Sequence, residues 1–150
     1  MNRYKNLFYA LVMILMSCSS KPEIYSSICG KDKTYQKVEM DNLLVNISYY
    51  DGKYVELRGK YRSGFEESAL YGKGFYSNSE NALWVEFDAF ILKCPLISSV
   101  NKTNLFGKEE SFKNMFNRTV MLHGRIDAEH QGHLSGYKAT IRDITLVVIE

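Results

Sequence analysis

The hydrophobic and polar residues of this chain alternate most regularly in two segments, residues 53–61 and 82–90. A period of two predicts β-strands with one face buried and the other face toward solvent. The residues expected to face inward are Val55, Leu57, Gly59, Tyr61, Leu83, Val85, Phe87 and Ala89. Those expected to face outward are Tyr54, Glu56, Arg58, Lys60, Trp84, Glu86 and Asp88.

Weaker patterns predict three further strands, in residues 67–71, 119–126 and 137–149. In the last segment the hydrophobic positions change face near Asp143, which indicates a β-bulge. Polar stretches that contain glycine predict the loops, at residues 72–81 and 129–136.

Two other segments place hydrophobic residues three and four positions apart, which predicts short helices. The first covers residues 42–48 with Asp41 as its N-cap, and the second covers residues 108–117. The order of elements puts a helix between the third and fourth strands of a mainly β domain. We therefore predict a small OB-like five-stranded barrel with one or two short helices, over residues 34–150.

The first 17 residues have the three parts of a lipoprotein signal peptide. Arg3 and Lys5 give a positive start, and the uncharged apolar run that follows has about ten residues, too few to cross a bilayer as a helix. Ser17 and Cys18 supply the small residue and the cysteine that lipidation requires. Cys18 is therefore predicted to carry the lipid. The alternatives are an ordinary secretory signal with a chance cysteine, or an uncleaved membrane anchor.

The expected anchor predicts where the domain is located. Residues 18–33 are predicted to be the lipidated cysteine and a polar tether. A lipid holds a domain on a membrane surface without crossing it, so the membrane is the first expected partner. Ser19 stands after the cysteine in place of an aspartate, which favours the outer membrane of a bacterial cell envelope, with the domain facing the periplasm.

The charge of the mature chain argues against one class of partner. Removal of residues 1–17 takes away Arg3 and Lys5, which lowers the 19 basic residues to 17 and equals the 17 acidic residues. A nucleic-acid-binding domain normally has a basic excess or a basic stripe. We therefore expect no nucleic-acid partner.

Two cysteines remain after lipidation of Cys18, namely Cys29 and Cys94. An exported compartment permits disulfides, and two cysteines are the minimum for one bridge. We predict a Cys29–Cys94 disulfide, which closes a loop of about 65 residues and adds roughly 4 kcal/mol of stability in the chain-entropy model. Two free thiols or a redox pair are the alternatives, although the Cys-x-x-Cys spacing of a common redox pair is absent.

Two parts of the sequence resemble a known group of proteins. The first is Leu43-Leu44-Val45-Asn46 with Tyr50-Asp51-Gly52-Lys53-Tyr54-Val55-Glu56-Leu57-Arg58-Gly59. The second contains Val120-Met121-Leu122-His123-Gly124-Arg125, Gly132-His133-Leu134 and Ile141-Arg142-Asp143-Ile144. Over residues 40–148 the chain thus resembles small exported bacterial OB-fold-like lipoproteins. The matching positions are turn glycines and apolar core residues, so the resemblance implies the barrel and no particular activity.

Three histidines, His123, His130 and His133, are candidate metal ligands because Asp127 and Glu129 lie among them. Imidazoles and carboxylates are a ligand set for zinc and related metals. The spacing is loose, however, because His123 is expected on a strand and the other two on a loop. The alternative is a polar hairpin with local hydrogen bonds, and we expect no bound metal or other cofactor.

Motifs of catalysis are missing from the sequence. It contains no Gly-x-Ser-x-Gly nucleophile motif and no complete phosphate-binding glycine-rich loop. Glu66 and Glu67 are adjacent, so in a strand they point to opposite faces. Glu86 and Asp88 share a face, which we expect to be a solvated strand surface. The domain is therefore predicted to have no enzymatic activity.

Aromatic residues form the predicted binding face. Tyr54 and Trp84 point outward from the two clearest strands, and Tyr71 lies near the loop between them. Exposed aromatic side chains on the first strands of an OB-like barrel stack on ligands or anchor protein partners. The alternative is that these side chains only fill space within the fold.

The sequence leads to three functional hypotheses. The first is an anchored binding module for an envelope protein, a peptide or a glycan. The second is an inhibitor or immunity-type lipoprotein that acts on an envelope hydrolase through residues 72–81 or 129–136. The third is a metal-binding lipoprotein that uses the three histidines.

Overall fold

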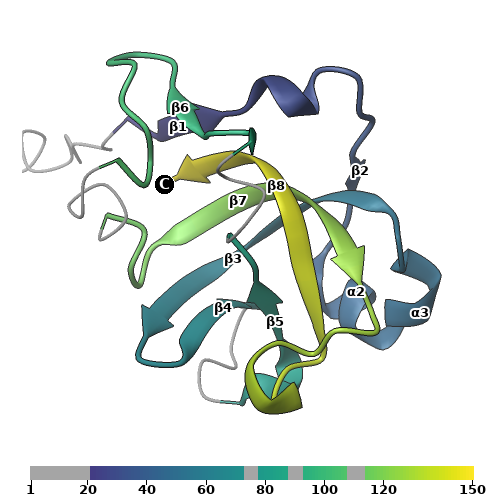
Figure 1. The fold of residues 1–150 in the computed structure, drawn as a ribbon. Helices are drawn as coiled ribbons and strands as arrows, with labels where there is room; N and C mark the ends of the chain where they lie inside the picture. Colours follow the sequence, from purple (N-terminus) through teal and green to yellow (C-terminus); the bar gives the residue numbers. More distant parts are fainter. Residues whose placement is uncertain (1–20, 73–77, 88–92, 108–113) are drawn as a thin grey trace, which may run out of the picture.

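A computed structural model describes residues 21–72, 78–87, 93–107 and 114–150, and its centre is a β-barrel (Figure 1). The barrel strands are β3 (Tyr54–Gly64), β4 (Glu67–Tyr71), β5 (Ala82–Val85), β7 (Thr119–Asp127) and β8 (Ala139–Ile149). Backbone pairing joins β3 to β4, β4 to β5, β5 to β8, β8 to β7 and β7 back to β3. All of these pairs are antiparallel except β5–β8, so the prediction of a small, closed, OB-like barrel is confirmed.

The interior of the barrel contains the residues that the alternation predicted. The predicted inward residues that the structure shows buried are Val55, Leu57, Tyr61, Leu83, Val85 and Phe87, whereas Ala89 lies outside the described residues. Gly59 has a different role at the junction of β3 and β4. A Cβ there would lie 2.5 Å from the carbonyl oxygen of Tyr71, so the two strands approach closely only because no side chain is present.

The predicted bulge in β8 is present. Between the His123–Leu146 and Arg125–Arg142 pairs, three residues of β8 stand opposite one residue of β7. Asp143 begins this extra stretch with a φ of 52°. The bulge adds two residues, so Ile141 before it and Val147 after it are both buried, and among the buried apolar residues only Ile144, within the bulge, departs from the period of two.

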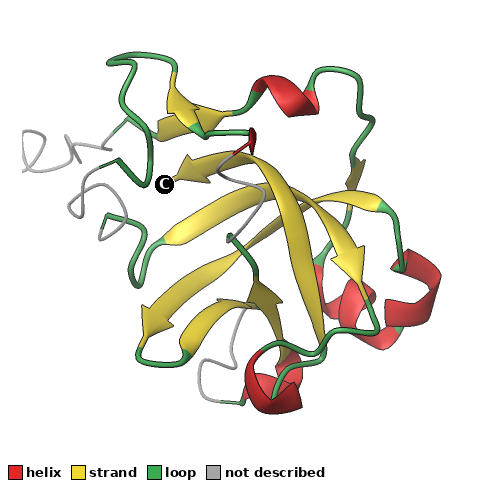
Figure 2. Cartoon of the chain, viewed as in Figure 1, coloured by secondary structure: helices red, strands yellow, loops and turns green. Residues whose placement is uncertain are grey.

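The first predicted helix is divided in two (Figure 2). The segment contains α2 (Met40–Val45) and α3 (Ile47–Tyr50). The N-cap is Glu39, so the prediction of Asp41 as N-cap is wrong. Asp41 lies in the first turn of α2, where a carboxylate favours the positive end of the helix. The break falls at Asn46, where φ is −113°.

Other predicted boundaries also differ from the structure. The strand expected over residues 82–90 ends at Val85, and residues 88–90 lie outside the described residues. Of the helix expected over residues 108–117, residues 108–113 lie outside the described part, and 114–117 form turns. The described residues also contain three short 3₁₀ helices: η1 (Ile28–Gly30), η2 (Ser79–Asn81) and η3 (His133–Ser135).

Part of the expected tether belongs to the folded domain. In it, β1 (Glu23–Ser26) pairs antiparallel with both β8 and β6 (Ile97–Ser98). Farther along, β2 (Gln36–Lys37) pairs with β3 in parallel. The folded structure therefore starts before residue 34, because β1 completes the edge of β8 with main-chain hydrogen bonds.

The predicted disulfide is confirmed. Cys29 and Cys94 are bonded with their Cα atoms 5.8 Å apart. The bridge ties the segment after β1 to the segment before β6. The expected signal peptide and Cys18 lie outside the described residues, so lipidation stays a prediction. Among the described residues, no helix is long and apolar enough to cross a membrane.

Candidate functional site

The aromatic side chains of the predicted binding face lie in separate surroundings. Tyr54 is half-buried on the outside of β3, where its ring meets Tyr35 edge-on with 5.9 Å between centroids. The ammonium nitrogen of Lys33 lies 4.1 Å from the centroid of the Tyr54 ring. Two residues of the N-terminal segment thus cover Tyr54, as the space-filling alternative predicts.

Tyr71 is even less accessible. Its side chain is buried in β4, with 4% of the residue exposed, and its hydroxyl donates a hydrogen bond of 2.9 Å to Oε1 of Glu67. Burial raises the pKa of Tyr71, and the bond to the carboxylate raises it further. Tyr71 is therefore mainly a packing residue of the barrel, although it also lines the groove over β3 that is described below.

Trp84 supports a loop. Its ring packs against Tyr137 at 5.3 Å between centroids, on the outside of β5. A Cβ added at Gly132 would lie 2.5 Å from the Cβ of Trp84, so the backbone of the β7–β8 loop rests directly on the indole. Since Tyr54 contacts the N-terminal segment and Trp84 contacts this loop, the described contacts do not join them into one face.

The three histidines also have separate partners. The shortest contacts are His123 Nε2 to Glu56 Oε2 at 2.9 Å, His130 Nδ1 to Asp127 Oδ2 at 2.9 Å and His133 Nε2 to Glu66 Oε2 at 3.4 Å. In the described part of the chain, no group of three or more His, Cys, Asp or Glu side chains could hold a metal ion. The geometry therefore gives no support to a centre built from these histidines.

Two neighbouring loops expose large apolar side chains. Phe65, on the β3–β4 loop, is 94% exposed, and Leu134, on the β7–β8 loop, is 86% exposed. Each is next in sequence to one member of the Glu66–His133 pair, which joins the loops. We call Phe65, Glu66, His133 and Leu134 the loop surface. In OB-like barrels, ligands commonly bind at these two loops.

Both loops contain residues with positive φ values, a backbone conformation that residues other than glycine rarely adopt. Glu66, Leu134 and Ser135 have φ values of 59°, 50° and 56°. Gly132 has a φ of 67° and a ψ of −155°, a region that is essentially restricted to glycine. Local hydrogen bonds hold the loop, including one of 3.0 Å from Tyr137 N to Gln131 O. Such strain persists only where surrounding contacts maintain it, and it is concentrated at functional sites.

A charged cluster fixes the start of the β7–β8 loop. Asp127 Oδ2 accepts hydrogen bonds from His130 at 2.9 Å and from Arg142 at 2.8 Å, and Arg142 also donates to Glu86 at 3.0 Å. Burial alone would raise the pKa of Asp127, but the bonds from His130 and Arg142 outweigh it and lower the pKa to about 2. The carboxylate is therefore ionised at neutral pH.

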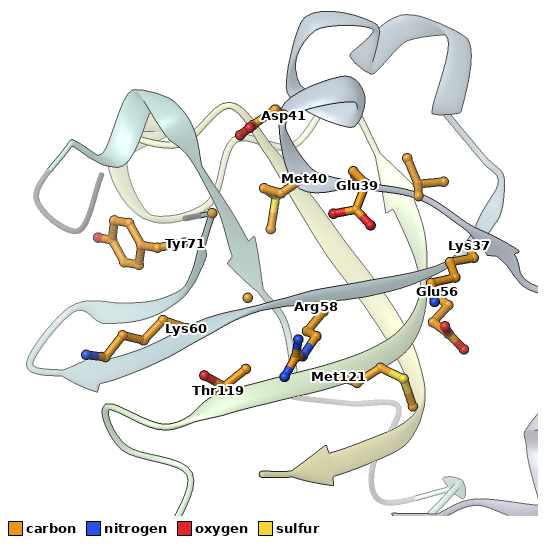
Figure 3. A pocket seen from close by; sticks show the side chains of 13 residues that line it. Lys37, Glu39, Met40, Asp41, Glu56, Arg58, Lys60, Tyr71, Thr119 and Met121 are labelled. Carbon is orange, nitrogen blue, oxygen red and sulfur yellow. The ribbon is translucent and has the colours of Figure 1, made fainter. Parts of the chain in front are cut away.

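A groove of about 460 Å³ crosses the outside of β3 (Figure 3). Figure 3 shows Glu39, Met40 and Asp41 on one side of β3, with Thr119 and Met121 of β7 on the other. Side chains of both signs line the groove, and Arg58 within it already donates hydrogen bonds to the Glu150 carboxylate. The mixed charge favours neither an anionic nor a cationic ligand.

Phe65 and Leu134 were not among the binding residues predicted from the sequence. The available signals were the turn glycines, Gly64 before Phe65 and Gly132 before Leu134, because an apolar residue at the tip of a turn has no neighbour to cover it. Comparison of the chain with protein-family models, with curated proteins and with solved structures gave no match.

Proposed function

We propose that this protein is a lipid-anchored protein of the bacterial envelope whose barrel binds another protein or a peptide through the loop surface. The observation that carries the proposal is the exposure of Phe65 and Leu134, 94% and 86%, on adjacent loops. A single exposed apolar residue is ordinary in folded proteins. Two of them that flank the same inter-loop pair resemble the apolar anchors that supply most of the energy of protein interfaces.

The fixed backbone of the loops supports the same function. Binding costs less free energy when the contacting residues are already ordered. Both loops are restricted before any partner binds. Glu66 and Leu134 have positive φ values, Glu66 contacts His133, and the backbone at Gly132 packs against Trp84. The loop surface is thus a preorganised pair of anchors.

The chemistry of the anchors favours a protein partner over a glycan. A phenylalanine and a leucine have no hydrogen-bonding groups, and they fit apolar pockets on another protein. A glycan requires polar groups for its hydroxyls beside any aromatic platform. If the binding test below identifies a glycan as the partner, the proposed class of partner is wrong.

The ionisable groups beside the loops support a non-catalytic role. A general acid or base that works near neutral pH needs a pKa close to that pH. Asp127 has a pKa of about 2, and its hydrogen bonds from His130 and Arg142 hold it in place. This cluster has the character of a structural support for the loop.

The test is direct binding with a matched control. Candidates captured from cross-linked envelopes are purified and titrated against the lipidated protein, its Phe65→Ser, Leu134→Ser variant and a Val45→Ser, Phe116→Ser variant. Val45 and Phe116 are also exposed, at 82% and 52%, but lie elsewhere on the chain. We expect at least about a tenfold loss of affinity in the loop variant alone, the effect of one anchor residue. Equal affinities of all three proteins for every captured partner would overturn the proposal.

A second candidate function is inhibition of an envelope hydrolase. The observation that favours it is Leu134, which lies on the strained β7–β8 loop within residues 129–136. A rigid loop of this kind fits an enzyme cleft with little loss of entropy. Addition of the protein to an identified hydrolase partner separates the two functions, since an inhibitor lowers turnover in a Leu134-dependent way and a simple binding module leaves it unchanged.

A further inference from the structure

The end of the molecule that carries β1 and β6 exposes a second pair of apolar side chains. Ile28, the first residue of η1, is 74% exposed, and Val100, on the turn after β6, is 88% exposed. A groove of about 720 Å³ lies between the elements that carry them. Its lining includes Ile28, Pro95, Ile97, Leu146, Lys31 and Lys102. We call this region the β1–β6 end.

This end is held rigidly. The Cys29–Cys94 disulfide lies next to Ile28 and fixes it to the segment before β6. On the other side, the hydroxyl of Ser98 accepts a hydrogen bond of 3.3 Å from the Val100 amide, which keeps the turn in shape. The apolar side chains are therefore presented to solvent by a fixed scaffold.

Exposed lysines lie on the same segments as the apolar pair. Lys21, Lys31 and Lys102 are all exposed at this end of the domain. Of the carboxylates on the same N-terminal segment, Glu23 accepts a hydrogen bond from Tyr25, and Asp32 is exposed beside Lys31. Exposed apolar side chains with lysines beside them are the pattern with which peripheral proteins lie on anionic lipid.

The expected anchor brings this surface to a membrane. If Cys18 carries the lipid, Glu23, where β1 begins, is the fifth residue after it. Because a residue spans at most about 3.6 Å, the start of β1 lies within about 18 Å of the lipidated residue. Figure 1 shows β1 and β6 at the top of the molecule and the β7–β8 loop at the bottom, so the loop surface lies away from the anchored end.

We propose that the β1–β6 end rests on an anionic phospholipid surface, with Ile28 and Val100 at headgroup depth and the lysines beside the phosphates. The proposal rests on the lipid anchor of the proposed function. It assigns an orientation to the anchored domain: the membrane contacts one end of the barrel, and the loop surface points toward the periplasm and its partner.

The experiment measures the depth of two positions on the lipidated full-length mature protein in vesicles. A fluorescent label is attached to Ser99→Cys at the β1–β6 end or to Gln131→Cys near the loop surface, both exposed residues. Vesicles of phosphatidylcholine with phosphatidylglycerol carry a quencher on the lipid, and vesicles of phosphatidylcholine alone are the comparison. We expect several-fold stronger quenching at Ser99 than at Gln131, and more of it with the anionic lipid.

A variant with Ile28→Ser, Val100→Ser, Lys31→Gln and Lys102→Gln should lose this quenching while it still sediments with the vesicles through its lipid. The matched control, Val45→Ser, should keep it. Circular dichroism and a thiol assay establish that each protein is folded and has its disulfide. Equal quenching at both positions, or none at Ser99, would overturn the membrane contact alone. An absence of lipid on Cys18 by mass spectrometry would instead overturn the anchor, and with it both proposals.

Discussion

The β1–β6 end and the loop surface are held in shape in different ways. A disulfide and a ladder of main-chain hydrogen bonds fix the β1–β6 end. The shape of the loop surface depends on backbone strain, one glycine and one inter-loop pair. Both ends expose large apolar side chains. The first end is stabilised covalently by Cys29–Cys94, and the second by the contact of Gly132 with Trp84 and of Glu66 with His133. A single barrel can therefore present two surfaces whose stability responds to different changes in sequence or conditions.

The largest expected effect concerns the covalent end. Replacement of both Cys29 and Cys94 by serine should lower the free energy of unfolding by about 4 kcal/mol, because the bridge closes a loop of 65 residues. Chemical denaturation measures the loss, and the wild-type protein in reducing buffer should lose a similar amount. An unchanged denaturation midpoint would show that the β1 ladder alone holds this end.

The next effect concerns the loop surface. Gly132→Ala should cost about 3 kcal/mol, since it combines an unfavourable positive φ with a Cβ placed 2.5 Å from Trp84. Gly52→Ala is the matched control, because Gly52 also has a positive φ, of 71°, but a Cβ there would meet nothing within 4 Å. The difference between the two unfolding free energies reports the contact with the indole together with the extra backbone strain at Gly132. Equal losses would mean that the loop does not depend on Trp84.

A smaller effect should appear in acid. The pKa of Asp127 is about 2 in the folded protein, against 3.8 for the free side chain. The unfolded chain therefore takes up the proton first, so the stabilisation is present above about pH 4 and is lost as the pH falls toward 2, by about 2 kcal/mol. Unfolding free energies measured across this range should fall more steeply for the wild type than for Asp127→Asn. If the unfolding free energies of the two proteins fall equally with pH, the low pKa of Asp127 does not contribute to stability.

The smallest effect concerns the pair between the loops. Both side chains are partly exposed, 38% for His133 and 52% for Glu66, so their coupling in a double-mutant cycle with glutamine should be under about 1 kcal/mol. We expect partner affinity to fall more than stability does, because the pair orders the loops. A coupling above that limit would show that the pair stabilises the fold itself.

The barrel was predictable because its signals are local. The period of two in β3 and β5 indicates which side chains enter the core. In β8, Ile144 is out of phase with Ile141 and Val147, which reveals the bulge that begins at Asp143. The disulfide followed from the count of cysteines. The role of β1 was hidden, since its four residues gain their structure from pairing with the far end of the chain, and such pairing leaves no period in the sequence.

The candidate site was less predictable. Tyr71 looked accessible, but the last three residues of β4 are all buried, so its two faces cannot be distinguished by alternation. Tyr54 is covered by Lys33 and Tyr35 of a segment that was expected to be a tether. Exposure at a loop tip depends on what the rest of the fold leaves uncovered, which is why Phe65 emerged only from the three-dimensional structure.

The pairing of β1 with residues 146–149 of β8 has a consequence for the timing of folding. The first strand of the domain binds the last one, so this contact has nearly the greatest sequence separation that the chain allows. Contacts between residues that are far apart in the sequence form slowly. A chain that crosses a membrane with its N-terminus first therefore cannot complete this sheet until its C-terminus has arrived. If the chain is exported as proposed, this topology delays completion of the sheet until transport is finished.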